Sequence, residues 1–324
     1  MILAFRNIRR VTVLIIGLAL SACAVTKAPM GDQSMTPRLE GDIFRTRDGL
    51  QLPLRRWDAE GSPRAIIVAL HGMSDYSNSF DGPAMQWAAS GITTLAFDQR
   101  GFGSAPNPGL WAGGDAMRAD LFDFVAAARA RYPGIPVFAL GESMGGAVLL
   151  SALATPEVPH LAGAILVAPA VWARRDMPLS YRVALFLTAH LVPGLILSNN
   201  TAGRVVTIVP SDNTAMLRAL GRDPLFQKET RVDALYGLVN LMDEARAAPQ
   251  KITDAPPILL LSGIKDQIIP QDATQAVIAD LGGRATVRRY EQGYHMLLRD
   301  LEGPTVNKDV ADWVLDKVRA AAPQ

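Results

Sequence analysis

The amino-acid sequence predicts an α/β fold built on a mostly parallel, doubly wound β-sheet, and two features of the chain lead to this prediction. Short apolar runs of strand length alternate with segments of helix length along most of the sequence, which is typical of parallel strands joined by crossover helices. Several of these runs are continuously apolar instead of alternating with polar residues, as expected for strands buried on both faces. Hydrophobic residues make up 49% of the 324 residues, which is enough for a large core.

The first two predicted strands, 42–45 and 52–57, are separated only by the short loop TRDGLQ. We therefore expect them to form an antiparallel hairpin at one edge of the sheet. The other strands are predicted at 65–70, 93–97, 137–140, 164–167, 258–262 and 286–290. Helices are predicted at 83–90, 116–131, 145–154, 271–281 and 307–321.

Residues 171–250 interrupt this alternation. They show no clear pair of strands, but they contain helical stretches at 179–191, 214–220 and 231–247 and many apolar residues, as in ALFLTAHLVPGLIL. Such a segment either completes the core or covers a hydrophobic pocket. We favour a helical lid inserted after the sixth strand, because the sheet already has its helices elsewhere.

The segment VFALGESMGGAVLL places Ser143 between an apolar run of strand length and one of helix length. Gly141 and Gly145 lack β-carbons, so the chain can turn sharply at this corner. The pattern G-x-S-x-G is that of the nucleophile elbow of α/β-hydrolases, in which the serine hydroxyl is exposed above the sheet. The Met144 N–H would then lie at a helix N-terminus and stabilise a developing negative charge. Taken alone, the motif also fits a glycine-rich corner with an ordinary serine.

A nucleophilic serine needs a base, and the order in this fold is serine, acid, histidine. Three histidines follow Ser143. His160 precedes a predicted strand, at the opposite end of the sheet, and His190 lies in an apolar helix of the lid. His295 follows the last predicted strand, and active sites of open α/β sheets gather where strands end. We therefore predict His295 as the base.

The acid is expected after the preceding strand, where LLLSGIKDQIIP supplies Asp266. Asp272 is the alternative, but it lies at the predicted start of a helix, where the helix dipole favours an acid for structural reasons. We predict that Asp266 orients His295 and stabilises its imidazolium form.

A second donor to the oxyanion is expected from the loop after the third predicted strand, which reads His71-Gly72-Met73. We assign this donor to the backbone N–H of Met73 and expect His71 to hold the loop by hydrogen bonds. For Asp98 and Arg100, in FDQRGFGSA, we expect salt-bridge or capping roles and no chemistry.

The N-terminus combines three arginines, the apolar run VTVLIIGLAL and the sequence Leu-Ser-Ala-Cys. This arrangement is typical of a signal peptide and resembles the lipobox of bacterial lipoproteins, which implies cleavage after residue 22 and lipid attachment to Cys23. Residues 23–38 read as the lipidated cysteine and a polar tether, and 39–324 as the hydrolase domain. An uncleaved anchor and a plain signal peptide remain alternatives. Since Ala24 replaces the Asp that often signals inner-membrane retention, we expect the outer membrane.

Five motifs in order, HGMSDYS, DQRGFGSA, GESMGG, SGIKDQIIP and YEQGYHML, resemble the family of monoacylglycerol lipases and lysophospholipases, also described as the serine aminopeptidase S33 type. The resemblance covers about residues 40–320 and includes Asp223-Pro224-Leu225 in the lid. It departs from the family in the residues that follow His-Gly. The resemblance implies a helical cap over an acyl pocket. Acyl transfer to water through the serine requires no metal or organic cofactor. By motif position it implies the nucleophile Ser143, the acid Asp266, the base His295, and an oxyanion hole from the backbones of Met73 and Met144.

These expectations combine into a serine hydrolase that cleaves carboxylic esters of lipids through an acyl-enzyme. We expect the acyl chain to contact Leu185, Phe186 and Leu191 of the lid. With a net charge of +1, nothing indicates nucleic acid as a partner. A small-ester esterase, a peptidase or an acyltransferase with the same triad remain alternatives, as does a binding lipoprotein without catalysis.

Overall fold

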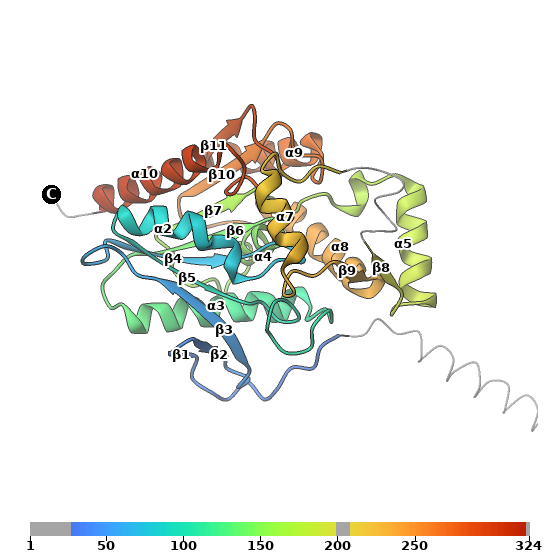
Figure 1. Cartoon of the computed structure of the whole chain (residues 1–324), viewed down its shortest axis with the longest axis horizontal. Helices are drawn as coiled ribbons and strands as arrows, with labels where there is room; N and C mark the ends of the chain where they lie inside the picture. The colour runs from blue at the N-terminus through green and yellow to red at the C-terminus, as the bar shows by residue number, and fades with distance from the viewer. Residues whose placement is uncertain (1–26, 199–207, 322–324) are drawn as a thin grey trace, which may run out of the picture.

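The computed structural model describes residues 27–198 and 208–321 (Figure 1). The predicted signal peptide, 1–22, and the predicted lipidation site, Cys23, lie outside the described residues. None of the helices within the described ranges is both long and apolar enough to cross a lipid bilayer.

Nine of the described strands form one sheet in the order β1-β2-β3-β5-β4-β6-β7-β10-β11, with parallel pairing from β5 to β11. The predicted hairpin at the edge is confirmed, because β2 pairs with β3 antiparallel, and β3 joins β5 antiparallel. The strands are β1 (Arg38–Glu40), β2 (Ile43–Arg45), β3 (Gln51–Trp57), β4 (Ala65–Leu70), β5 (Ile92–Phe97), β6 (Val137–Glu142), β7 (Gly163–Val167), β10 (Ile258–Gly263) and β11 (Ala285–Tyr290).

Helices cover both faces of the sheet, as predicted for a doubly wound fold (Figure 1). Strand β4 shows the reason: all six of its residues are buried, and alternate side chains belong to the two separate hydrophobic clusters on opposite faces. Helices α2 (Asp81–Ala89) and α10 (Gly303–Ala321) contribute to one cluster. Helices α3 (Gly114–Arg131), α4 (Met144–Ala152) and α9 (Gln271–Leu281) contribute to the other. Short 3₁₀ turns are η1 (Ser77–Phe80) and η4 (Gly282–Arg284).

The cap lies between β7 and β10, as predicted. It contains η2 (Arg174–Asp176), α5 (Leu179–Leu191), β8 (Ile196–Ser198), α7 (Thr214–Arg222), β9 (Glu229–Arg231), α8 (Val232–Ala247) and η3 (Ala248–Gln250). The expectation of no strand pair is wrong, because β8 and β9 pair antiparallel. Three-residue strands are too short to show a period of two in the sequence. Helix α8 completes the core through Leu241 and Ala245, whereas α5 exposes most of its side chains.

Part of the predicted tether contacts the domain. Lys27 forms a β-bridge with Trp111, and the N–H of Ala28 donates to the Trp111 carbonyl at 2.9 Å. Further along, the N–H of Met35 donates to the Arg47 carbonyl at 2.9 Å. The polar composition of this segment gave no sign of these backbone pairings, which place its residues from 27 onward on the domain surface.

Candidate active site

Three predicted residues meet at the carboxyl edge of the sheet. Ser143 follows β6, Asp266 follows β10, and His295 follows β11. The Nε2 atom of His295 lies 2.9 Å from Ser143 Oγ, and its Nδ1 atom lies 2.8 Å from Asp266 Oδ2. The two ring nitrogens of one imidazole therefore connect a hydroxyl to a carboxylate, which is the geometry of a serine nucleophile with its base and orienting acid.

The backbone around Ser143 forms the sharp corner that the G-x-S-x-G motif predicts. Ser143 has φ 52° and ψ −113°, a conformation that is costly for a residue with a side chain and is held only when the surroundings enforce it. A β-carbon on Gly141 would lie 2.3 Å from the Gly145 carbonyl oxygen, and one on Gly145 would lie 2.2 Å from the Leu70 carbonyl oxygen. Both positions therefore require glycine. The Ser143 N–H donates to the Val167 carbonyl at 2.9 Å, which ties the corner to β7.

Asp266 is held by the backbone that follows it. Its Oδ1 accepts hydrogen bonds from the N–H groups of Ile268 and Ile269, at 2.8 and 3.0 Å. Its other oxygen therefore faces His295. The alternative acid, Asp272, is exposed in the first turn of α9, as its sequence position predicts.

His295 is buried among charges that shift its titration. Burial alone would lower the pKa of His295. The charge of Asp266 and the hydrogen bond to it, together with the charges of Glu142 and Asp300, raise this pKa by more than burial lowers it. The net result is a pKa above the ordinary value of 6.5. The imidazolium form is therefore stabilised, as a general base requires when it accepts the serine proton.

The loop after β4 lies directly against Ser143. A β-carbon on Gly72 would lie 3.2 Å from Ser143 Cβ and 3.8 Å from its Oγ. Met73 follows Gly72, and Met144 is the first residue of α4. Within the described chain neither of these two N–H groups has a protein acceptor. They are available to an oxyanion beside Ser143.

His71 orders this loop, as predicted. Its Nε2 accepts from the Gln99 N–H at 2.9 Å, so Nδ1 carries the proton and donates to the Gly72 carbonyl at 2.9 Å. Burial lowers the pKa of His71, which keeps the ring neutral. The expected structural roles of Asp98 and Arg100 are also confirmed. Asp98 accepts from the backbone and hydroxyl of Ser77, and Arg100 pairs with two buried carboxylates, those of Asp48 and Asp120.

A buried charge cluster beside the triad was not predicted. Arg299 donates to Asp75 at 2.5 Å and lies 3.8 Å from Glu142, the residue before the nucleophile. Burial raises the pKa of Glu142. Arg299 and Asp75 are 224 residues apart, so no sequence pattern indicates their pairing, although Glu142 and Asp75 lie inside recognisable motifs.

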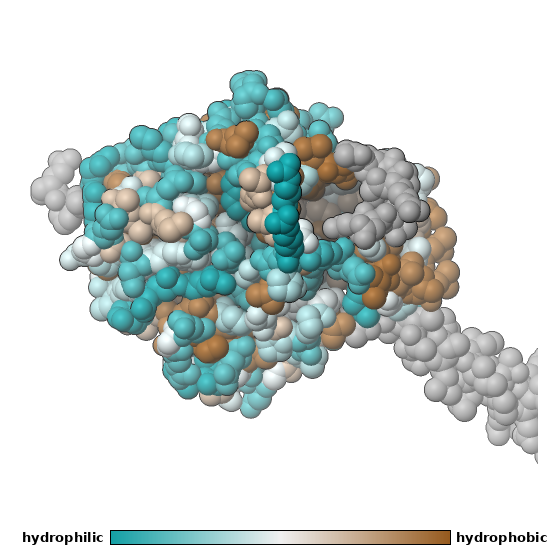
Figure 2. Space-filling view, viewed as in Figure 1, coloured by the Kyte–Doolittle hydropathy of each residue, from teal (hydrophilic) through white to brown (hydrophobic). Residues whose placement is uncertain are grey.

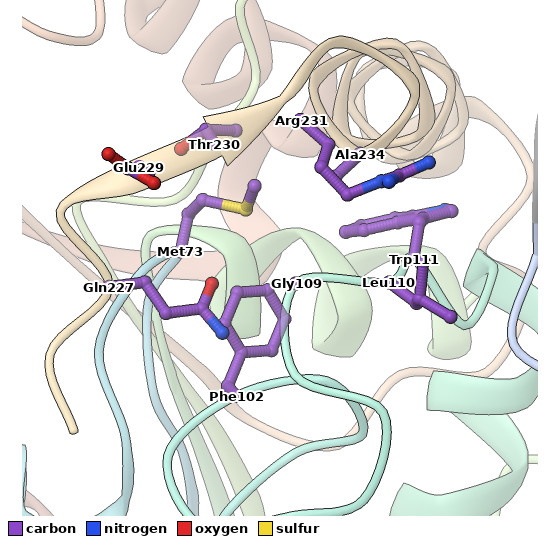
Figure 3. A pocket seen from close by; sticks show the side chains of 10 residues that line it. All are labelled: Met73, Phe102, Gly109, Leu110, Trp111, Gln227, Glu229, Thr230, Arg231 and Ala234. Carbon is purple, nitrogen blue, oxygen red and sulfur yellow. The ribbon is translucent and has the colours of Figure 1, made fainter. Parts of the chain in front are cut away.

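A small pocket opens between the cap and the loops that follow β4 and β5 (Figure 3). Its lining joins Met73 and Phe102 of the body to Gln227 and Arg231 of the cap. Met73, one of the two predicted oxyanion residues, belongs to this lining.

The lid residues predicted to contact the acyl chain do not line this pocket. Phe186 and Leu191 are 53% and 65% exposed, and Leu185 is half-buried against the core. The physical reason is the packing of α5, in which Ala189 is the buried residue and the larger apolar side chains reach the surface. Contact of an acyl chain with Leu185, Phe186 and Leu191 stays a prediction.

Comparisons with known proteins agree with this geometry. The chain is 29% identical to the monoglyceride lipase of Rattus norvegicus over 281 residues, which covers 85% of this chain and 90% of the relative. It is 26% identical to the monoacylglycerol lipase of Mycolicibacterium smegmatis, covering 82% and 94%. The crystal structure of a soluble variant of monoglyceride lipase from Saccharomyces cerevisiae, in complex with a substrate analog, superposes with a TM-score of 0.71 at 19% identity. It covers 90% of this chain and 99% of that one, which supports the α/β-hydrolase fold.

The sequence profile of the family described as "Serine aminopeptidase, S33" matches residues 61–302. This range contains Ser143, Asp266 and His295 together with both predicted oxyanion residues. No group of three or more histidine, cysteine, aspartate or glutamate side chains is arranged to hold a metal ion within 27–198 and 208–321. The chain belongs to the serine aminopeptidase S33 family of α/β-hydrolases.

Proposed function

We propose that the protein is a serine hydrolase that cleaves carboxylic esters of lipids, of the monoacylglycerol or lysophospholipid type, through an acyl-enzyme. The observation that carries the proposal is the 2.9 Å contact between Ser143 Oγ and His295 Nε2, with Asp266 behind the ring at 2.8 Å. A serine hydroxyl is a poor nucleophile until a base accepts its proton.

In the first half of the reaction, Ser143 Oγ attacks the ester carbonyl carbon while its proton passes to His295. The carbonyl π electrons move to the oxygen, which the N–H groups of Met73 and Met144 stabilise. The C–O bond to the alcohol then breaks, and the leaving alcohol takes the proton from His295. Water repeats the sequence on the acyl-enzyme, with His295 as base, and releases the fatty acid. No step requires a metal or an organic cofactor.

The substrate class follows from the relatives and from the composition of the site. The curated relatives are named as monoglyceride lipases and, in Bacillus subtilis, as the phospholipase YtpA, which is 25% identical over 258 residues. Apolar side chains of Met73, Phe102 and Trp111 line the pocket together with the polar Gln227 and Arg231. The boundary between cap and body thus offers both apolar and polar groups.

The N-terminal sequence supports a location in the cell envelope. We propose cleavage before Cys23 and lipid attachment to its sulfur, with the outer membrane as the destination. Mass spectrometry of the purified protein tests this. A peptide that begins at Cys23 and carries diacylglyceryl and acyl groups supports the anchor, and an intact N-terminus or an unmodified Cys23 contradicts it.

A substrate panel tests the proposed activity. Monoacylglycerols, lysophospholipids, p-nitrophenyl esters and peptide anilides are offered to the native chain, to Ser143→Ala, and to Ser151→Ala as a matched control. Ser151 lies in the same helix and donates to the Val148 carbonyl. We expect ester turnover that falls by about 10³-fold or more in Ser143→Ala and persists in Ser151→Ala. Turnover of anilides alone supports a peptidase, and products formed only with added alcohols support an acyltransferase.

A further inference from the structure

The short cap segment that precedes helix α7, residues 209–213, lies against both loops that carry the acid and the base of the triad. We call it the docking segment. On the side of the acid, the N–H of Val209 donates to the side-chain oxygen of Gln267 at 3.0 Å. Gln267 directly follows Asp266 in the chain, so the cap contacts the loop that holds the orienting carboxylate.

The other four residues of the docking segment each form a hydrogen bond with the loop that carries His295. These bonds join the Met296 N–H to the Pro210 carbonyl at 3.0 Å, the Ser211 hydroxyl to Asp300 at 2.5 Å, the Leu301 N–H to Asp212 at 2.9 Å, and the Asn213 amide to the Arg299 carbonyl at 2.9 Å. All residues of the docking segment therefore bind the two loops of the triad, and the position of the cap is connected to the position of these loops.

Helix α7 continues directly from the docking segment. Asn213 is its N-cap residue, and the Asn213 side chain accepts from the Met216 N–H at 3.1 Å. The apolar Met216, Leu217 and Leu220 are half-buried, whereas the arginines of the helix are exposed. Figure 2 shows a hydrophilic strip, in teal, at the place that α7 occupies in Figure 1. The docking segment is thus joined to a helix that packs on the protein through its apolar side.

Asp300 connects the docking segment to the backbone next to the base. Its Oδ1 accepts from the Ser211 hydroxyl, and its Oδ2 accepts from the N–H of Tyr294 at 2.6 Å. Tyr294 directly precedes His295. Because Asp300 and Ser211 are only 3% and 1% exposed, water competes little for either bond. One carboxylate therefore holds the cap with one oxygen and the backbone of the base with the other.

Asp300 also acts on the base through its charge. It is one of three carboxylates whose charges raise the pKa of His295. Burial raises the pKa of Asp300, and the hydrogen bond from Ser211 opposes this rise, since a hydrogen bond to a carboxylate favours its charged form. The charged groups next to Asp300 and His295 are Asp212 of the docking segment, Arg299 of the same loop, Asp75 after β4, Glu142 of β6 and Asp266 after β10.

We propose that Asp300 is a positioning residue for His295 and that Ser211, which the cap supplies, holds Asp300 in place. The alignment of the catalytic base then depends on whether the docking segment of the cap is seated. This inference rests on the role of His295 as the base in the proposed function.

The rate at which a fluorophosphonate labels Ser143 tests the proposal, because this rate depends on the base and requires no knowledge of the substrate. It is measured between about pH 5 and pH 9 for the native chain, Ser211→Ala, Asp300→Ala and the double variant. The same proteins give kcat and KM for p-nitrophenyl acetate. Circular dichroism verifies the fold of each variant. Ser211→Ala keeps the carboxylate and carries the test if Asp300→Ala does not fold.

We expect the labelling rate at the pH where His295 is neutral to fall about tenfold in Ser211→Ala and about 10²-fold in Asp300→Ala, because a small displacement of a catalytic group is costly. The loss appears in kcat for the acetate, with KM changed by less than about twofold. Since Ser211 acts through Asp300, the double variant reacts as slowly as Asp300→Ala alone. Loss of the charge at position 300 also moves the midpoint of the acidic limb downward.

Two control variants separate positioning from a general loss of stability. Asp123→Asn alters a carboxylate of helix α3 that is 1% exposed and accepts from the backbone and the guanidinium of Arg47. Ser151→Ala removes a buried hydroxyl of helix α4 that donates to the Val148 carbonyl. Both are expected to keep the native labelling rate and pH profile.

Native labelling rates in folded Ser211→Ala and Asp300→Ala overturn the proposal. Losses that multiply in the double variant show that the two residues act separately and overturn it as well, as do equal losses in the control variants. An unlabelled native chain contradicts the proposed function, and this inference falls with it. A native chain that is labelled but does not turn over lipid esters contradicts the proposed substrate alone, and the labelling rates of the variants then decide the inference.

Discussion

The backbone N–H of Gln227, in the cap, donates a 2.8 Å hydrogen bond to the carbonyl oxygen of Ser74, the residue that follows Met73. Ser74 has φ 69°, a left-handed conformation that is uncommon for a residue with a side chain. A second contact joins the same parts, because the Tyr76 hydroxyl donates to Asp223 at 2.7 Å. The cap thus holds the loop that carries one predicted oxyanion donor.

The variant Tyr76→Phe tests this connection. It removes the donor to Asp223 and leaves the aromatic packing unchanged. Because a hydrogen bond to a charged group contributes about 1.5–3 kcal/mol, we expect kcat for a small soluble ester to fall about tenfold or more as the loop loses its position. The loss is expected in kcat more than in KM, since an oxyanion donor acts in the transition state.

Tyr132→Phe serves as the control, because Tyr132 lies at the end of α3, whereas the hydroxyl that donates to Asp223 belongs to Tyr76. A Tyr76→Phe enzyme with the native kcat would show that the cap does not position the oxyanion loop.

Gly145, the glycine after the nucleophile at the elbow, leads to a prediction about the stability of the fold. A β-carbon on Gly145 would lie 2.2 Å from the Leu70 carbonyl oxygen and 2.6 Å from its carbon. Backbone atoms cannot move aside as a flexible side chain can, so Gly145→Ala is expected to lower the free energy of unfolding by several kcal/mol, on the order of 3 or more. Urea denaturation followed by circular dichroism measures it.

Gly221→Ala is the matched control, since Gly221 lies in helix α7 with nothing within 4 Å of the added carbon. Alanine there is expected to stabilise the fold by up to about 1 kcal/mol. Equal stabilities of the two variants would contradict the steric account of the elbow.

The sequence predicted those features that depend on local pattern and chain order. The continuous apolar runs predicted the parallel sheet. The elbow motif and the chain order of serine, acid and base predicted Ser143, Asp266 and His295, which meet in the structure. These predictions succeeded because a strand-end position and a motif fix where a side chain lies relative to the sheet.

Features that depend on packing between distant segments were not accessible. The apolar composition of α5 does not reveal which side of the helix meets the body of the protein, where Ala189 is buried and Phe186 is exposed. The pairing of Arg299 with Asp75 spans 224 residues and leaves no periodic signal. The β8–β9 pair is three residues long on each side, which is too short for a pattern.

The pH profile follows from the direction of the His295 shift. The pKa of His295 lies above 6.5, and only the neutral ring accepts the proton of Ser143. As the pH falls through the pKa of His295, the ring gains a proton and kcat/KM decreases, with a midpoint above 6.5 for the acidic limb. The profile is measured with a soluble ester between about pH 5 and pH 9.

Removing the acid partner changes this profile. Asp266→Asn removes a charge that raises the pKa of His295, so the midpoint of the acidic limb is expected to move downward while kcat falls by about 10⁴-fold. Asp272→Asn, which alters an exposed acid of α9, is expected to leave both unchanged. The reverse pattern would assign the orienting role to Asp272.

Covalent labelling of Ser143 tests the central claim most directly, because it requires an activated hydroxyl and no knowledge of the substrate. The native protein is treated with a fluorophosphonate, digested and examined by mass spectrometry. We predict one modified peptide, with the phosphonyl group on Ser143, no labelling in Ser143→Ala, and labelling slowed by orders of magnitude in His295→Ala. An unlabelled native protein that is fully folded, or labelling that persists in Ser143→Ala, would contradict the account.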